Sequence, residues 1–448
     1  MKAGAARRDI TPAVGMTIDA PKRTSAGVHD PLYVRAVVLA DDSGELVAIF
    51  CFDLIGCTFE VSDQVRRAVR EATGIEHVLL NFGHQHSSRV LGAPGSRGET
   101  AEDAAWNERV HRAIVELAAE AKAGAAPARL RVGRAAVQVG YNRRITYADG
   151  SVGMGDNKDG AVVPWVNVLV AEEMKSGRAI AVLFEHAAHP VIVPDKSNLT
   201  SADYPGAAVA RVNEELGADV VAMFAQGCGA NINGYPLRTT HANADAAGRK
   251  LGEAVLKAGR EAGPITAEKL VVRSASIELP SQPYPTMAVW QQTRDNLESD
   301  WKRGTESGRP VEWITEEVYR NSLKLLETVR GLIERGASPP ARRFDVTAAM
   351  LGEQWCLVAL AGEIFCEYEL WVDEAGPFER TMVFGYTNGI CGYVATDEAL
   401  AMGEKGGYEA GSYPCWWAEG LNAPYYSPPA VGTETRIREA VVSCWSGR

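Results

Sequence analysis

The chain of 448 residues lacks three features that would each point to a function class. No apolar segment is long enough for a transmembrane helix, which argues against membrane insertion. No CxxC pair occurs among the eight cysteines, which are scattered through the chain as in reduced cytoplasmic proteins. No basic cluster is present, and the formal net charge of -11 argues against nucleic acid or an anionic membrane as a partner.

The chain also shows no internal repeat, no low-complexity segment and no linker-like stretch, so we predict a single domain over residues 1–448. Its first residues carry an arginine pair without the apolar run of a secretion signal. We therefore expect a cytoplasmic protein. The sequence leaves the oligomeric state open.

Short apolar runs alternate with amphipathic segments along most of the chain, which is typical of α/β proteins. Strands are predicted at 34–40, 46–54, 77–80, 130–139, 166–171, 179–184, 220–225, 270–279, 344–351, 354–360 and 381–385, and helices at 60–72, 101–123, 207–216, 242–262 and 434–442. A stretch at about 287–334 contains long helical patterns that are broken at 303–310, and it is predicted to be a helical insertion whose tryptophans serve packing. The predicted fold is α/β, with mixed β-sheets flanked by helices and one helical insertion.

Two histidines, His84 and His86, follow the apolar run 77–80 directly. In an extended segment, residues two apart share a face, so both imidazoles are expected to project to one side. That arrangement suits a metal site or a proton relay, and it suits two ordinary hydrogen-bonded histidines equally well. Asp53 ends the neighbouring strand, where a carboxylate can fix a histidine tautomer or simply cap a turn.

A second histidine pair, His186 and His189, lies where the strand 179–184 ends. Residues three apart point to opposite faces of an extended chain, so we expect only one of the two to be a ligand. Two strand ends that are far apart in sequence and rich in histidine indicate a metal site at the edge of a sheet.

Three further segments contain candidate site residues. The adjacent Arg143 and Arg144 are predicted to lie in a loop. They could bind a carbonyl or carboxylate, or they could be solvated cations on the surface. The glycine-rich loop 226–234 brings backbone amides close to a ligand, and Cys228 within it is better explained as a buried thiol than as a nucleophile. Glu363 follows a glycine turn at a predicted helix start. A glutamate at that position usually does no more than stabilise the helix dipole.

The motifs occur in an order that resembles the catalytic domain of the neutral, non-lysosomal ceramidase family. The matching stretches are Arg8-Asp9-Ile10-Thr11-Pro12, Gly83-His84-Gln85-His86-Ser87, Asn142-Arg143-Arg144, Ala188-His189-Pro190, Phe224-Ala225-Gln226, Ala361-Gly362-Glu363, Gly385-Tyr386-Thr387-Asn388-Gly389 and Gly407-Tyr408-Glu409. Together they span most of residues 1–426 outside the helical insertion. The resemblance implies a ceramidase-like catalytic domain.

The resemblance also implies one Zn²⁺ ion. Its ligands by correspondence are His84, His189, Glu363 and Tyr408, while His86 and Arg143 face the scissile group. Two imidazoles and a carboxylate are a known catalytic zinc set, and zinc lowers the pKa of its bound water to about 7. We assign His86 to proton transfer or oxyanion stabilisation, and Arg143 to orienting the carbonyl or a nearby anionic group.

The sequence departs from the family at a position where the family carries a functional serine, because Asn233 stands there. Asparagine is no hydroxyl nucleophile, but it can donate a hydrogen bond to an oxyanion. There is also no room after Val431 for the family's C-terminal immunoglobulin-like domain, and the secretion signal is missing. The last two departures lead us to expect a small-molecule substrate that is soluble, intracellular, and smaller and more polar than ceramide.

The sequence therefore predicts a zinc-dependent amidohydrolase that cleaves a non-peptide C–N bond of an N-acyl compound by zinc-activated water. A zinc esterase or lactonase and a catalytically silent binding protein remain as alternatives. All four ligands are present, which favours an enzyme, and no cysteine spacing supports a structural zinc site. The aromatic loops around Tyr386, Tyr393 and Tyr413 indicate a partly apolar pocket, with Tyr413 as the substrate-binding candidate.

Overall fold

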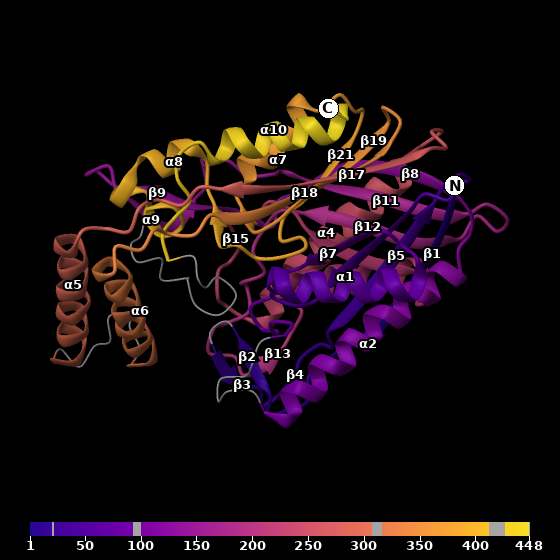
Figure 1. Ribbon diagram of the computed structural model, residues 1–448. Helices are drawn as coiled ribbons and strands as arrows, with labels where there is room; N and C mark the ends of the chain where they lie inside the picture. The colour runs from indigo at the N-terminus through magenta and orange to yellow at the C-terminus, as the bar shows by residue number, and fades with distance from the viewer. Residues whose placement is uncertain (20–21, 93–99, 307–315, 412–425, 448) are drawn as a thin grey trace.

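Most of the apolar runs become strands of two large sheets in the computed structural model, which describes residues 1–19, 22–92, 100–306, 316–411 and 426–447 (Figure 1). The larger sheet has nine strands in the order β14-β12-β11-β8-β1-β5-β6-β7, with β16 paired to β8. Its two halves are joined by only two residue pairs, Lys2 with Pro127 and Ala3 with Ala126.

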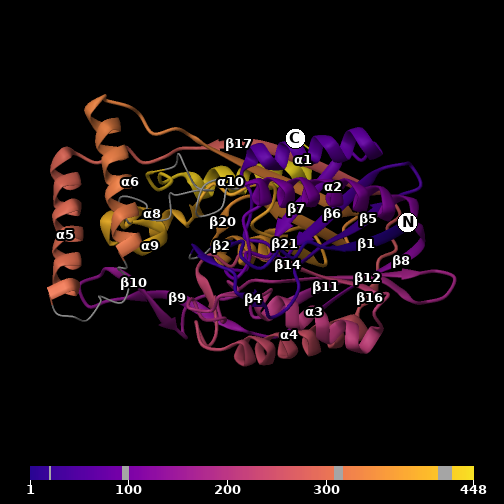
Figure 2. The same cartoon turned by 90° about the horizontal axis from the view of Figure 1, so that it is seen from below.

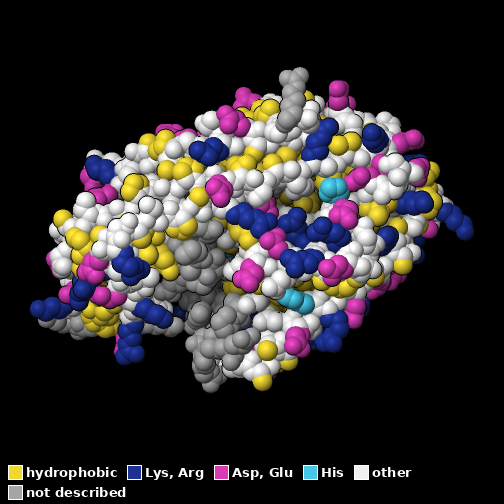
Figure 3. Space-filling view, viewed as in Figure 1, with side chains coloured by type: hydrophobic (Ala, Val, Ile, Leu, Met, Phe, Trp, Pro, Cys, Tyr) yellow, Lys and Arg dark blue, Asp and Glu magenta, His cyan; other side chains and the backbone are white. Residues whose placement is uncertain are grey.

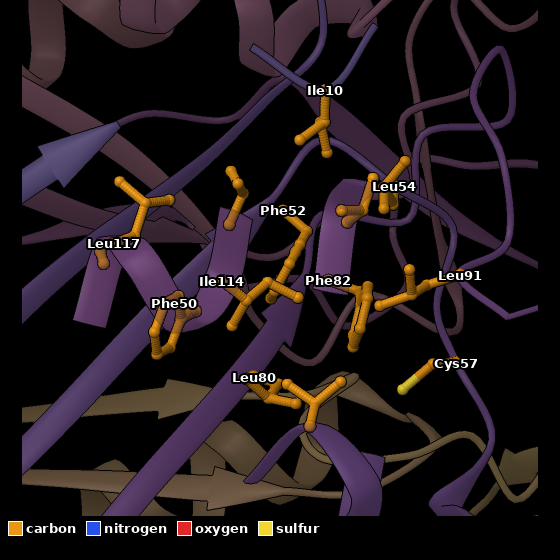
Figure 4. Packing of buried hydrophobic residues seen from close by; sticks show 14 of the residues in the cluster. Ile10, Phe50, Phe52, Leu54, Cys57, Leu80, Phe82, Leu91, Ile114 and Leu117 are labelled. Carbon is orange, nitrogen blue, oxygen red and sulfur yellow. The ribbon is translucent and has the colours of Figure 1, made fainter. Parts of the chain in front are cut away.

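The first half is covered on its outer face by two helices. Its strands are β1 (Lys2–Asp9), β5 (Tyr33–Ala40), β6 (Leu46–Phe52) and β7 (His77–Phe82), and the helices are α1 (Phe59–Thr73) and α2 (Ala101–Ala123). Alternate strand residues such as Phe50 and Phe52 pack against Ile114 and Leu117 of α2 (Figure 4). Helix α2 begins at a capping box formed by Thr100 and Asp103, which sets its first turn.

The second half has its own helical layer. Its strands are β8 (Ala126–Ala136), β11 (Trp165–Glu173), β12 (Ala179–His186), β14 (Val221–Gln226) and β16 (Gly263–Pro264), and the helices are α3 (Asp203–Leu216) and α4 (His241–Glu261). Valines and phenylalanines on the outer face of these strands pack against both helices. Figure 2 shows the two helical layers on opposite sides of the molecule.

The second sheet has four strands in the order β17-β18-β19-β21, and its outer face is covered by α7 and α10. The elements are β17 (Leu270–Leu279), β18 (Arg342–Leu351), β19 (Trp355–Leu360), β21 (Thr381–Phe384), α7 (Cys366–Ala375) and α10 (Thr433–Ser446). Its inner face meets both halves of the larger sheet, since Leu357 and Phe384 share one core cluster with Ile49 and Leu183. The predicted arrangement of mixed sheets flanked by helices is confirmed.

Short elements complete the described chain. They are β2 (Thr17–Asp19), β3 (Lys22–Thr24), β4 (Gly27–Val28), β9 (Gly140–Thr146), β10 (Val152–Asn157), β13 (Leu199–Thr200), β15 (Ile232–Gly234), β20 (Glu363–Ile364), β22 (Tyr393–Val394), α8 (Asp397–Ala401), the 3-10 helix η1 (Gly403–Lys405) and α9 (Gly407–Ala410). The prediction of a loop around Arg143 is wrong, because this stretch is strand β9 between β10 and β15. Its side chains are largely polar on both faces, so the alternation that marks a strand is absent.

The helical stretch at 287–334 forms a hairpin of α5 (Met287–Glu306) and α6 (Glu316–Glu334) that projects from the body in both ribbon views (Figures 1 and 2). Trp290, Leu297 and Leu326 form a small core of its own, and Trp301 stacks on Tyr319. Both described tryptophans therefore serve packing, as predicted, while Trp313 lies outside the described residues.

The carboxyl ends of β7, β14 and β21 meet at one end of the molecule. Asn81 at the end of β7 exchanges hydrogen bonds with the backbone of Gln226, and Phe82 donates from its backbone to Tyr386. The loops that leave these strands are thereby brought together.

Charged side chains of both signs are interspersed over the face shown in Figure 3. None of the helices in the described part of the chain has the length and hydropathy that a membrane span requires.

Candidate metal centre

The loop after β7 brings His84 and His86 together, although not as an extended strand. The backbone of His84 has a φ of 63°, so the chain turns sharply after β7 has ended at Phe82. Left-handed backbone is costly for a residue with a Cβ atom and tends to occur at functional sites. The His84 N–H donates to the carbonyl of Leu54, which helps to hold this turn.

His189 reaches the same place from the loop after β12. One ring nitrogen from each of His84, His86 and His189 lies within 4.8 Å of the others. The ring centroids are 5.1 Å apart for His84 and His86, 5.1 Å for His84 and His189, and 5.9 Å for His86 and His189. The two histidine loops therefore form one cluster, as the sequence predicted.

The backbone fixes the tautomer of two of these rings. His84 Nδ1 lies 2.8 Å from the carbonyl of Ile55, and His189 Nδ1 lies 2.6 Å from that of Gly229. A carbonyl oxygen only accepts, so Nδ1 bears a proton in both rings and Nε2 is the nitrogen that faces the cluster. Burial, with Arg143 nearby, also lowers the pKa of His189 to about 4, so this ring is neutral at pH 7.

Glu363 faces both Nε2 atoms. Its Oε2 atom lies 3.4 Å from His84 Nε2 and 3.2 Å from His189 Nε2. Burial alone would raise the pKa of this carboxyl, but the two histidines hold it at about 2, so Glu363 is a carboxylate. Gly362 has a φ of 72° and turns the chain from β19 into β20, which places Glu363 in the cluster.

The donor set fits a metal ion. His86 Nε2 is buried and has no hydrogen-bond partner among the described residues. A buried nitrogen without a partner is costly unless something else binds it. Two imidazoles whose Nδ1 atoms are held by carbonyls, together with a carboxylate, are what catalytic metal sites use.

Three tyrosines surround this cluster. Tyr386, with a φ of 48°, places its hydroxyl 3.5 Å from His189 Nε2, and Tyr393 pairs with Glu363 along the parallel strands β20 and β22. Burial, with Glu363 nearby, raises the pKa of both phenols well above 10. Tyr408 packs its ring against Tyr393, with 5.5 Å between the centroids. Its role as a fourth ligand stays a prediction.

Arg143 is held beside the cluster by three side chains. Its Nε donates to Glu409 over 2.8 Å, its Nη1 donates to Asn233 Oδ1 over 3.1 Å, and it hydrogen-bonds with Tyr393. Burial would lower its pKa, but Tyr393 and Glu409 raise it, so Arg143 is charged. Arg144 Nη1 donates to the other carboxylate oxygen of Glu409 over 2.7 Å. The two arginines are therefore anchored rather than solvated.

Other residues singled out in the sequence lie elsewhere. His186 Nδ1 bonds the carbonyl of Trp165, and Asp53 pairs with Arg35 over 2.7 Å rather than with a histidine. Cys228 is buried, and burial raises its pKa, as expected for an inert thiol. Tyr413 lies outside the described residues.

The sequence matches no family model and no curated protein, whereas solved structures do match the model. The fold resembles that of neutral ceramidase. The neutral ceramidase from Pseudomonas aeruginosa superposes with a TM-score of 0.66 and 16% identity, over 99% of this chain and 74% of that one. A structure described as ceramidase complexed with C2 gives a TM-score of 0.67 and 16% identity, over 100% of this chain and 75% of that one. At this identity the likeness concerns the fold.

Two buried acids lie next to the backbone that holds the candidate metal centre. Glu185 of β12 and Glu369 of α7 hydrogen-bond to each other and flank Gly227, where a Cβ atom would lie 2.4 Å and 2.8 Å from their oxygens. Glu369 also accepts from the Cys228 N–H over 3.0 Å, next to the Gly229 carbonyl that holds His189. Burial raises the pKa of both carboxyls, that of Glu185 to about 7, so the pair holds a proton near neutral pH.

This pair predicts a pH-dependent loss of stability. An unfolded glutamate has a pKa of about 4.3, so between that pH and about 7 the folded state retains protons that the unfolded state has lost. Stability therefore falls as pH rises through this window. Glu369→Gln removes the shared proton and keeps the donor to Glu185. We expect the free energy of unfolding of Glu369→Gln, relative to that of wild type, to rise by on the order of 2 kcal/mol from pH 5 to pH 8.

Urea unfolding at both pH values measures this difference. Glu108→Gln, at an exposed glutamate of α2, is the matched control and should follow wild type. Identical pH dependence of wild type and Glu369→Gln would show that the two acids share no proton.

Proposed function

We propose that this protein is a zinc-dependent hydrolase that cleaves the amide bond of a small N-acyl compound. The observation that carries the proposal is the convergence of His84 Nε2 and His189 Nε2 on the carboxylate of Glu363. The ceramidase-like fold supports the reaction class, because both matching structures are described as ceramidases. On this proposal the chain is a distant member of the neutral ceramidase family.

The chain itself supplies the positioning. His84, His189 and Glu363 would hold the ion, with Tyr408 as the proposed fourth ligand. Tyr386 and Tyr393 are two further phenols beside the cluster, and the sequence did not single them out as ligands. When bound, zinc would polarise the scissile carbonyl and lower the pKa of a bound water. The carbonyls of Ile55 and Gly229 keep the two imidazoles turned toward the ion.

The remaining site residues act on the substrate. Burial, with His84 and His189 nearby, lowers the pKa of His86 well below 6.5, so the ring is neutral and can accept a proton at its unpartnered Nε2. Arg143 is charged and anchored, which suits the binding of an oxygen that gains negative charge. Asn233 accepts from Arg143 through Oδ1, so its amide group is left to donate.

Ester or lactone hydrolysis is the second candidate, because the same site can act on either carbonyl. A matched panel of N-acyl amides and O-acyl esters with the same acyl groups separates the two. We expect amide hydrolysis that is lost on chelation and restored by zinc. Turnover of esters alone would select the esterase, and no turnover of either class with zinc bound would select a silent binding protein.

A further inference from the structure

The face of the sheet that presents His189 continues past the metal centre. His189 is bridged in parallel to Asn233, and Asn233 pairs directly with Tyr141 on β9. Directly paired residues point to the same side of a sheet, and so do residues two apart along a strand. His189, Asn233 and Tyr141 therefore form one row, with Arg143 and Tyr235 on the same side.

Two measured contacts agree with this placement. Arg143 donates to Asn233 at one end of the face, and the rings of Tyr141 and Tyr235 meet edge to face at 5.1 Å on the other. Tyr235 is 39% exposed and Tyr141 is half-buried, so the aromatic pair is open to solvent. Neighbouring strands lie about 4.8 Å apart, which puts Tyr141 about 10 Å from His189. We call Tyr141, Tyr235 and Lys158 the aromatic shelf.

Lys158 supplies the charge of this shelf. Its Nζ atom lies 5.7 Å from the centroids of both tyrosine rings. Within the described part of the chain, Lys158 makes no hydrogen bond and no ion pair. The other cations near the site are already paired, since Arg143 and Arg144 share Glu409 and Arg238 pairs with Asp195.

We propose that the aromatic shelf binds the end of the substrate remote from the scissile bond, and that this end carries a carboxylate that pairs with Lys158. The segment between the carboxylate and the scissile bond, about 10 Å long, lies against Tyr141 and Tyr235. A single ammonium group suits a monoanion, whereas phosphate sites usually add an arginine fork or several backbone amides. The inference rests on the proposed function, and it narrows the substrate to an N-acyl compound with a distal carboxylate.

The kinetic test compares two substrates that differ only at the distal end, one with a carboxylate and one with a primary carboxamide. We expect wild type to prefer the carboxylate substrate through a lower KM. Lys158→Gln should raise that KM about fivefold, as for a partly exposed ion pair, without changing kcat or the KM of the carboxamide. Lys175→Gln, at an exposed lysine in the turn between β11 and β12, removes the same charge and should change neither KM.

A binding test separates this proposal from the hydrolase proposal. Calorimetry on zinc-depleted protein measures the affinity for a dicarboxylic acid of the matching length and for the corresponding monoacid. Lys158→Gln should weaken only the dicarboxylic acid, and Tyr141→Ala should weaken both acids. Equal affinities in wild type, or an equal effect of Lys158→Gln and Lys175→Gln, would overturn the shelf even if amides are hydrolysed. A lysine-dependent preference would support it even if they are not.

Discussion

His84→Ala and His189→Ala are expected to lose the metal ion and with it hydrolytic activity. Each change removes an Nε2 atom that faces Glu363, so that only one of the two imidazoles remains beside the carboxylate. Loss of a residue that only hydrogen-bonds to a ligand already weakens metal binding by about 10- to 100-fold, so loss of a ligand itself should exceed that range. Elemental analysis after dialysis should find about one zinc per chain in wild type and almost none in the variants.

The control is His77→Ala, at a partly exposed histidine of β7 that pairs with Glu45. It should keep the zinc content and activity of wild type. Circular dichroism and urea unfolding establish that all three variants are folded. Wild-type zinc content in folded His84→Ala or His189→Ala would place the ion elsewhere.

Arg143→Lys is expected to lower kcat about 100-fold while zinc content is unchanged. Lysine keeps the positive charge beside Glu409, so the buried carboxylate stays compensated. A single ammonium group cannot span Glu409, Asn233 and Tyr393 as the guanidinium fork does, so the charge is no longer fixed toward the substrate. Removal of one well-placed donor typically costs about 100- to 1000-fold in rate.

Two further variants show whether this loss reflects catalysis. Arg144 is the second partner of Glu409 and does not contact Asn233. Arg144→Lys should therefore lower kcat only a few-fold. Asn233→Ala should lose activity and keep zinc, because the side chain of Asn233 bonds to Arg143 and not to a proposed metal ligand. Equal losses for Arg143→Lys and Arg144→Lys, or loss of zinc in Asn233→Ala, would show that these residues only support the fold of the site.

Much of the fold could be predicted because the strands are buried on both faces and read as apolar runs. Helix α2 has the predicted bounds, 101–123, since its capping box and alanine-rich sequence define both ends. The convergence of the histidine loops followed from their positions after strands. The stated reason for pairing His84 with His86 was wrong, however, because the left-handed backbone at His84 rather than an extended strand brings their rings together.

The rest of the site depends on contacts that leave no local pattern. Tyr393 reaches Glu363 because two very short strands pair in parallel, and nothing in the spacing of these residues indicates it. Glu369 reads as an ordinary helix glutamate until the fold buries it against Glu185. Strand β9 reads as a polar loop because Arg143 and Asn142 both turn toward buried partners.

The most direct test of the central claim is an anomalous difference map, recorded at the zinc absorption edge from crystals of the purified protein. The account predicts one strong peak bonded to His84 Nε2, His189 Nε2 and Glu363, at about 2.0 to 2.2 Å. It also predicts that the peak disappears from crystals of His189→Ala. No peak among these residues in a protein that still hydrolyses amides, or a peak elsewhere in the chain, would contradict it.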